Sequence, residues 1–131
     1  MLFRSLPTGT VQVGYAREGE GDFGGGISAY YFWFFPNLVI NAYGWGLSLN
    51  ILEPLSPTRS QVRYRRIVRN RSKLGTGPGG DLATVELEDD AIVASVAHGA
   101  RSSLAKAGRY APAHEAGVHH FHRMFLAALS A

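Results

Sequence analysis

An uncharged run of 26 residues constrains the fold of this 131-residue chain more than any other feature. The run extends from Ile27 to Leu52 and reads ISAYYFWFFPNLVINAYGWGLSLNIL. The side chains of such a run must be buried away from water, either in a membrane-spanning helix or in a buried sheet. β-Branched and aromatic residues dominate it, and Pro36 and the glycines around Trp45 interrupt it at turn-like spacing. We therefore expect antiparallel strands here and no membrane segment.

The rest of the sequence predicts strands in the first half of the chain and helices in the second. We expect a loop-rich lead-in over 1–26 with a short strand near Val11–Tyr15, antiparallel strands over 27–70, a long helix over 81–107 and a C-terminal helix over 117–130. Asp81 is a suitable N-cap for the long helix, and Gly108 a suitable stop. Strands followed by helices favour a single α+β domain with an antiparallel sheet over an alternating α/β fold. The expected strands of the sheet are Tyr30–Phe35, Leu38–Tyr43, Leu47–Glu53 and Gln61–Arg69.

Composition excludes several classes of site. The chain has no cysteine, which excludes disulfides, thiolate zinc sites, a cysteine nucleophile and an iron–sulfur cluster held by this chain. A run of basic residues between Arg59 and Lys73 is a candidate for nucleic-acid binding. On a strand, however, Arg63 and Arg65 fall on the face opposite Tyr64, so we interpret the run as a solvated face. We expect no nucleic-acid partner.

Four histidines, His114, His119, His120 and His122, cluster near the C-terminus. His119 and His122 are one helical turn apart, a spacing that suits two metal ligands. The surrounding HEAGVHH nevertheless lacks the H-E-x-x-H pattern of zinc proteases. We interpret the group as a surface or capping cluster.

One carboxylate of the long helix is placed unusually. At about 100° per residue, Leu82, Val85, Ile92 and Val96 form an apolar stripe, and Asp89 falls at its centre. An unpaired buried carboxylate is costly and tends to take up a proton. Three explanations remain open from the residues alone: an ion pair with an arginine of the sheet, an acid of raised pKa, or a metal ligand.

Three stretches of the chain carry a resemblance to a known family. They read FPNLVINAYGWGLSLNILEPLSPTRSQVRYRRIV, LEDDAIVASVAHGARSS and GRYAPAHEAGVHHFHRMF. In order and spacing they resemble the C-terminal part of the catalytic domain of the large (α) subunit of Rieske-type aromatic-ring-hydroxylating oxygenases. That resemblance implies a helix-grip, START-like fold, in which a curved antiparallel sheet wraps around a long helix.

The resemblance also implies a role for Asp89. In this family, mononuclear Fe(II) is held by two histidines and one aspartate, and the aspartate lies in an acidic pair ten residues before a glycine. Counting back ten residues from Gly99 gives Asp89, with Glu88 as its acidic neighbour. The sequence departs from the family at Ala94, where glutamate is common, and at His98, where arginine is common.

The family's two histidine ligands precede the aspartate, yet no histidine precedes His98 in this chain. The Rieske domain with its [2Fe–2S] cluster is absent as well. We therefore expect a fragment of an α subunit that is inactive alone, whether from a truncated gene, a split subunit or an excised piece. It would carry one of the three ligands of Fe(II).

For the complete enzyme, the resemblance implies hydroxylation of an aromatic or other apolar small molecule, as a mono- or dioxygenase. O2 would be the oxidant, and electrons would come from a ferredoxin or reductase. We expect a cytoplasmic protein and a homotrimer of complete subunits. The alternative is a non-catalytic small-molecule-binding domain of the helix-grip type. The expected substrate-pocket residues are Phe32, Phe34, Asn37, Val39, Asn41 and Leu49.

Overall fold

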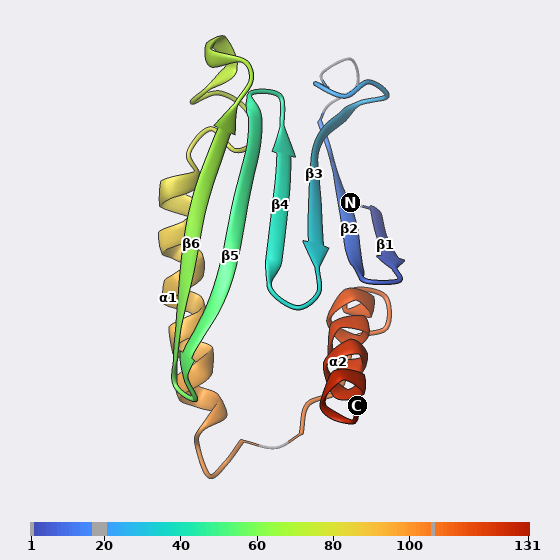
Figure 1. The fold of residues 1–131 in the computed structure, drawn as a ribbon, viewed down its shortest axis with the longest axis vertical. Coiled ribbons are helices and arrows are strands. Elements are labelled where there is room, and N and C mark those ends of the chain that lie inside the picture. Colours follow the sequence, from blue (N-terminus) through green and yellow to red (C-terminus); the bar gives the residue numbers. More distant parts are fainter. Residues whose placement is uncertain (1, 17–20, 106) are drawn as a thin grey trace.

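The protein is described by a computed structural model that covers residues 2–16, 21–105 and 107–131. Within these residues, a six-stranded antiparallel sheet is accompanied by two α-helices (Figure 1). Each strand pairs with the next in the chain, so the spatial order β1 to β6 is also the sequence order. The expected α+β class is thereby confirmed. The elements are β1 (Leu2–Leu6), β2 (Gly9–Tyr15), β3 (Ile27–Phe34), β4 (Leu38–Tyr43), β5 (Gly46–Ser56), β6 (Arg59–Val68), η1 (Arg71–Lys73), α1 (Leu82–Ala100) and α2 (Ala116–Leu129).

The uncharged run forms the centre of the sheet, as the sequence predicts. It supplies β3, β4 and the first part of β5, joined by tight turns. Trp33 pairs with Val39 across β3 and β4, and Leu38 pairs with Ile51 across β4 and β5. None of the described helices is long and apolar enough to cross a membrane.

Two expectations about the elements need correction. The lead-in is richer in strand than expected, because β1 pairs with β2 along its whole length. The long helix ends at Ala100, seven residues before the predicted end. The Ser102 hydroxyl accepts a hydrogen bond from the backbone N–H of Leu104 at 3.2 Å, which gives the chain a local alternative to further helix. Residues 17–20 of the expected loop, and residue 106 of the expected helix, lie outside the described residues.

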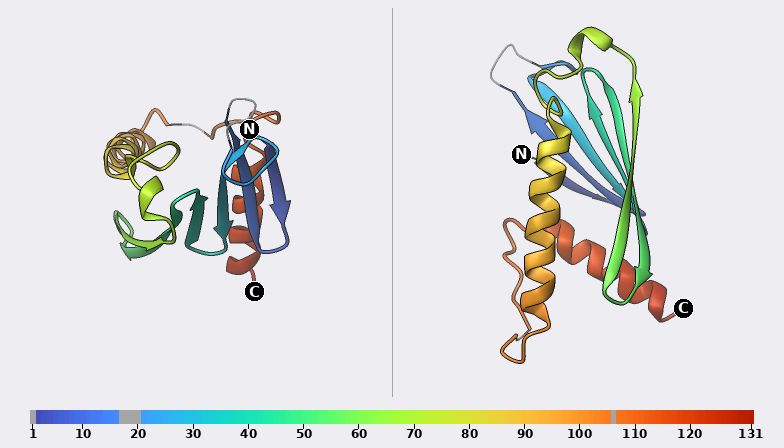
Figure 2. Two further views of the ribbon diagram at one scale, coloured as in Figure 1. Left: turned by 90° about the horizontal axis from the view of Figure 1, so that it is seen from above. Right: turned by 90° about the vertical axis from the view of Figure 1, so that its left-hand side faces the viewer.

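Both helices contact the same face of the sheet, which we call the helix face. The register places Ala29, Tyr31 and Trp33 of β3 on one face, together with Val39 and Tyr43 of β4. Ala29 and Tyr43 pack against Leu82 of α1, and the ring of Trp33 meets the ring of Phe121 in α2. The two helices lie at different places on this face: α1 runs beside β5 and β6, and α2 lies below the ends of β1–β3 (Figures 1 and 2).

A small aromatic core attaches α1 to the sheet. Ala29, Tyr43, Trp45 and Leu82 form one buried cluster, and the rings of Tyr43 and Trp45 stack with centroids 5.4 Å apart. The indole N–H of Trp45 donates a hydrogen bond to the carbonyl oxygen of Gly79 at 3.2 Å. Gly79 has a φ of 75°, and a Cβ atom built on it would lie 2.8 Å from three ring atoms of Tyr43. The close approach and the left-handed backbone therefore both require glycine at this position.

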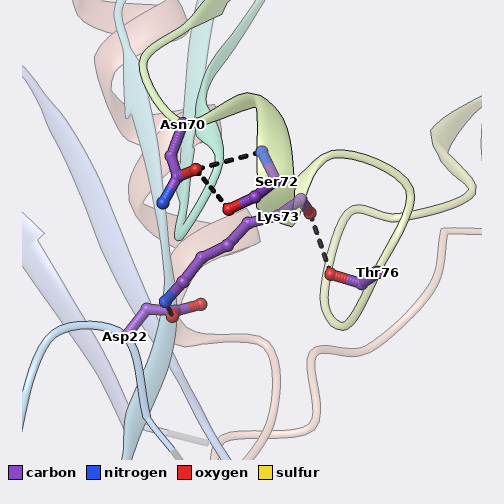
Figure 3. Close-up of polar contacts among 5 residues, drawn as sticks. All are labelled: Asp22, Asn70, Ser72, Lys73 and Thr76. Carbon is purple, nitrogen blue, oxygen red and sulfur yellow. Dashed lines mark hydrogen bonds and ion pairs between the residues drawn. The ribbon is translucent and has the colours of Figure 1, made fainter.

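Short polar contacts fold the connection between β6 and α1 (Figure 3). The side-chain oxygen of Asn70 accepts hydrogen bonds from the backbone N–H of Ser72 at 3.1 Å and from its hydroxyl at 2.7 Å. The hydroxyl of Thr76 donates to the carbonyl oxygen of Lys73 at 2.9 Å. Lys73 also forms an ion pair with Asp22, which ties this connection to the segment before β3. The connection is thus more ordered than its glycine-rich sequence suggests.

Alanine at Gly79 should destabilise the fold more than alanine at Gly77. Both glycines have a positive φ, so each substitution should cost about 1–2 kcal/mol of backbone strain. A Cβ atom on Gly77 meets nothing within 4 Å, whereas one on Gly79 collides with Tyr43. We expect Gly79→Ala to lower the free energy of unfolding by at least about 1 kcal/mol more than Gly77→Ala. Urea unfolding of both variants measures the difference, and equal losses would contradict the packing of Gly79 on Tyr43.

The ionisation of Tyr43 should make the fold sensitive to alkaline pH. Burial, followed by the fields of Tyr31 and Glu86, raises the pKa of Tyr43 from 10.0 to about 12. The folded state therefore favours the neutral phenol, and this stabilisation is complete below pH 10 and lost as the pH rises towards 12. The variant Tyr43→Phe should accordingly lose less stability than the wild type over this window. Tyr15, whose side chain is exposed, provides the control substitution Tyr15→Phe, which should behave as the wild type does.

Candidate functional site

Helix α1 carries the acidic residues that the sequence singled out. Its N-cap is Asp81, as expected, and the side chain of Asp81 accepts a hydrogen bond from the backbone N–H of Thr84 at 3.3 Å. The buried core receives only the first turn of the helix, through Leu82. Beyond that turn the helix stands beside the sheet (Figure 2).

Asp89 does not point into a core in this structure, and its predicted burial is wrong. The residue is exposed, and so is the apolar stripe that surrounds it: Val85 is 50% exposed, Ile92 62% and Val96 65%. The helical wheel located the centre of the stripe, but the described residues do not cover that stripe. No hydrogen bond or ion pair engages the carboxylate of Asp89 within the described part of the chain. Asp89 therefore needs neither a proton nor an arginine to remain in the fold.

The least exposed acid of α1 is Glu86. Its side chain is half-buried, and burial raises the pKa of its carboxyl group. The positive charge of Arg66 on β6 lowers this pKa, and the negative charge of Asp90 raises it further. Burial also raises the pKa of Tyr64 on β6, with smaller contributions from Asp90, Glu86 and Asp89 in that order. Arg66 of the sheet thus acts on Glu86, one turn before Asp89, so the structure does not show the ion pair that was one of the three explanations for Asp89.

The expected substrate-pocket residues do not share one face of the sheet. The pairing register divides them, with Val39 and Asn41 on the helix face and Phe32, Phe34 and Leu49 on the opposite face. They therefore cannot line one cavity together, which corrects that expectation. The rings of Phe32 and Phe34 instead stack with each other, with centroids 6.2 Å apart.

The sixth expected pocket residue, Asn37, lies in the turn between β3 and β4. Its side-chain amide donates a hydrogen bond to the carbonyl oxygen of Leu52 at 2.9 Å. This contact ties the turn to β5, so Asn37 has a structural role in this fold.

The arginines of β6 and the histidines of α2 occupy mostly exposed positions. Arg63 is exposed and forms an ion pair with Glu53 at 2.8 Å. His122 is hydrogen-bonded through Nδ1 to the hydroxyl group of Tyr110, and Nε2 of His120 lies 2.9 Å from the carbonyl oxygen of Leu6. These contacts hold α2 to the segment before it and to β1.

A cavity between α2 and the first strands was not predicted from the sequence. Its volume is about 430 Å³, and Trp33 and Phe121 form part of its lining with ring centroids 4.8 Å apart. These two aromatic residues are 88 positions apart in the chain, so no local pattern could have paired them. Their separation in the chain explains why this site could not be predicted from a sequence motif.

The described residues do not fit a complete mononuclear iron site. Non-haem Fe(II) in oxygenases is held by two imidazoles and one carboxylate. Nowhere in the described ranges do three or more histidine, aspartate or glutamate side chains converge as a metal-binding group. Asp89 has a free carboxylate on an exposed helix face, so it can supply one ligand, but the described chain supplies no imidazole beside it.

Comparisons with known proteins agree with the sequence motifs. The family model described as "Ring hydroxylating alpha subunit (catalytic domain)" matches residues 10–131. Choline monooxygenase of the chloroplast from Spinacia oleracea is 28% identical over 102 residues, which cover 74% of this chain and 23% of that protein. This chain thus spans about a quarter of the length of the relative, and no solved structure matches it. Because the family model extends over nearly the whole sequence, the chain belongs to the family of ring-hydroxylating oxygenase α subunits, within their catalytic domain.

Proposed function

We propose that this chain forms the C-terminal part of the catalytic domain of a Rieske non-haem iron oxygenase. The complete enzyme would hydroxylate an aromatic or other apolar small molecule, with O2 as oxidant and electrons from a ferredoxin or reductase. The observation that carries this proposal is the family match over residues 10–131. A homotrimer of complete subunits in the cytoplasm, with Fe(II) and a [2Fe–2S] cluster as cofactors, completes the proposal.

Within this function, Asp89 is our proposed iron ligand. Its carboxylate is exposed and makes no hydrogen bond or ion pair with the described residues, so both oxygens are available. Glu86, by contrast, is half-buried beside Arg66. The position ten residues before Gly99, which the family resemblance selects, therefore coincides with an unengaged acid. The two histidine ligands would have to come from sequence outside this chain.

The name of the relative bears on the choice of substrate. Choline monooxygenase acts on choline, which is a small cation and has no aromatic ring. We therefore include small non-aromatic molecules among the substrates of the complete enzyme.

The alternative function is a non-catalytic small-molecule-binding domain. One observation favours it: the described residues hold a 430 Å³ cavity but no group of three metal-binding side chains. Iron binding by the complete subunit distinguishes the two functions.

Replacing Asp89 should remove iron from the complete α subunit without damage to the fold. We expect Asp89→Asn to lose the mononuclear iron and the hydroxylation activity, while Asp90→Asn retains both. In the 131-residue chain, each substitution should change the free energy of unfolding by no more than about 0.5 kcal/mol, because both side chains are exposed. Metal analysis of the purified variants measures the outcome. If Asp90→Asn lost the iron and Asp89→Asn retained it, the iron ligand would be Asp90 and our assignment would be wrong by one position.

The 131-residue chain on its own should have no oxygenase activity. It has no cysteine to hold a [2Fe–2S] cluster, and its described residues include no three-ligand iron group. The purified chain, supplied with Fe(II), a reductase and O2, should form no hydroxylated product from toluene or choline. Product formation that depends on the chain would refute this expectation.

A further inference from the structure

The cavity between α2 and the sheet is widely open to solvent and has the size of a small-molecule site. Its volume of about 430 Å³ falls within the range of roughly 300–1,000 Å³ that is typical of ligand pockets. Its lining residues Thr10 and Trp33 pair across β2 and β3 on the helix face. Helix α2 lies at the β1–β3 end of the sheet, whereas α1 lies at the β5–β6 end (Figure 1). The cavity is lined by Thr10, Gln12, Trp33, His114, Gly117, Val118 and Phe121.

The apolar part of the lining suits a flat ring. Trp33 and Phe121 meet edge to face, with centroids 4.8 Å apart and an interplanar angle of 68°. Val118 lines the cavity beside them. Aromatic side chains in this arrangement leave ring faces and edges that favour contact with a further aromatic ring.

The polar part of the lining contains an unused hydroxyl group. Thr10 is only 8% exposed, and its side chain lines the cavity. In the described part of the chain, no hydrogen-bond partner engages this hydroxyl. Because no side-chain oxygen that is sealed from solvent lacks a partner in the described residues, this hydroxyl remains open to the cavity, where it can donate to a ligand acceptor in place of water.

The first turn of α2 provides a second set of free donors. Its N-cap residue, Glu115, makes no side-chain capping bond and instead accepts a hydrogen bond from the backbone N–H of Ala111 at 2.6 Å. The first turn contains no acidic residue. The N–H groups of Gly117 and Val118 belong to this turn, so they have no partner within the helix, and both residues line the cavity. A helix N-terminus carries a partial positive charge and favours an anion.

We propose that this cavity binds a small aromatic carboxylic acid. The ring lies against Trp33 and Phe121, and the carboxylate accepts hydrogen bonds from the Thr10 hydroxyl and from the first-turn amides of α2. This site is separate from Asp89 and does not depend on the proposed oxygenase function, because it requires neither iron nor electrons.

The two tryptophans of the chain allow a direct test with benzoate. Trp33 lines the cavity, whereas Trp45 is 1% exposed within the core beside α1. Incorporation of 5-fluorotryptophan into the 131-residue chain gives two fluorine resonances, which Trp33→Phe and Trp45→Phe assign. Benzoate should shift the Trp33 resonance saturably and leave the Trp45 resonance in place. Benzyl alcohol should bind at least tenfold more weakly than benzoate, and acetate should produce no shift.

Three variants of the chain test the lining residues. Thr10→Val should weaken benzoate binding about tenfold, because it removes a hydrogen bond to a charged group. Phe121→Ala should abolish binding, whereas Leu126→Ala on the exposed side of the same helix should leave it unchanged. An unmoved Trp45 resonance shows that each variant is folded. If Phe121→Ala disturbs that resonance, Phe121→Leu replaces it and should weaken binding at least fivefold.

Several outcomes would overturn the proposal. One is a Trp33 resonance that does not move at millimolar benzoate. Another is a shift that persists unchanged in both Thr10→Val and the Phe121 variant. Benzyl alcohol binding as tightly as benzoate would refute the role of the carboxylate. Loss or retention of iron in the complete subunit has no bearing on these results, so the two proposals fail independently.

Discussion

The hydrogen bond from Trp45 to Gly79 fixes where the second half of the chain meets the sheet. It joins residues 34 positions apart, and it does so within the same cluster in which Tyr43 and Leu82 are buried. Gly79 lies three residues before Leu82, so this bond determines where α1 begins and which face of the sheet it accompanies. The polar contacts of Asn70 and Lys73 hold the preceding turn in place, but they are exposed and contribute less to stability than the buried aromatic cluster.

Helix α1 is exposed because only its first turn, through Leu82, packs into the buried core of the sheet. After Leu82, contact with the sheet continues mainly through Glu86, whose carboxylate lies in the field of Arg66 and close to Tyr64. The helix is therefore held at one end, and the apolar residues around Asp89 remain uncovered by the described chain. Covering this stripe would bury Asp89 among apolar side chains, where a carboxylate requires a positive partner. The proposed role as an iron ligand would supply that partner.

Patterns local in sequence predicted the strands well. The β-branched and aromatic residues of Ile27–Leu52 and the turn signals around Pro36 and Trp45 predicted β3, β4 and the start of β5, because such residues are enriched in strands that lie within a sheet. β1 was not expected, since its five residues are too few to show a pattern and become a strand only by pairing with β2. The order of strands before helices predicted the α+β class. The family resemblance added the helix-grip expectation and selected Asp89 by its distance from Gly99.

Features that depend on contacts between residues far apart in the chain could not be predicted from the sequence. The register divided the expected pocket residues between two faces, because a strand alternates sides at every residue and a sequence motif does not specify which side is covered. The helical wheel identified an apolar stripe on α1, but it could not indicate whether the chain covers that stripe. The contact between Trp33 and Phe121 arises only when α2 folds back against the ends of β1–β3, so the cavity that these two residues help to line could not be anticipated.

The two ends of the helix face differ in the charged groups that lie near them. Glu86, Asp89 and Asp90 lie on α1 and help to raise the pKa of Tyr64 on β6, whereas the first turn of α2 has backbone N–H groups without a partner in the helix, which carry a partial positive charge. An uncharged apolar molecule near Asp89 meets the exposed valine and isoleucine side chains of α1. Our two proposals therefore assign different ends of the sheet, with the aromatic acid at the α2 end and the iron ligand Asp89 at the α1 end.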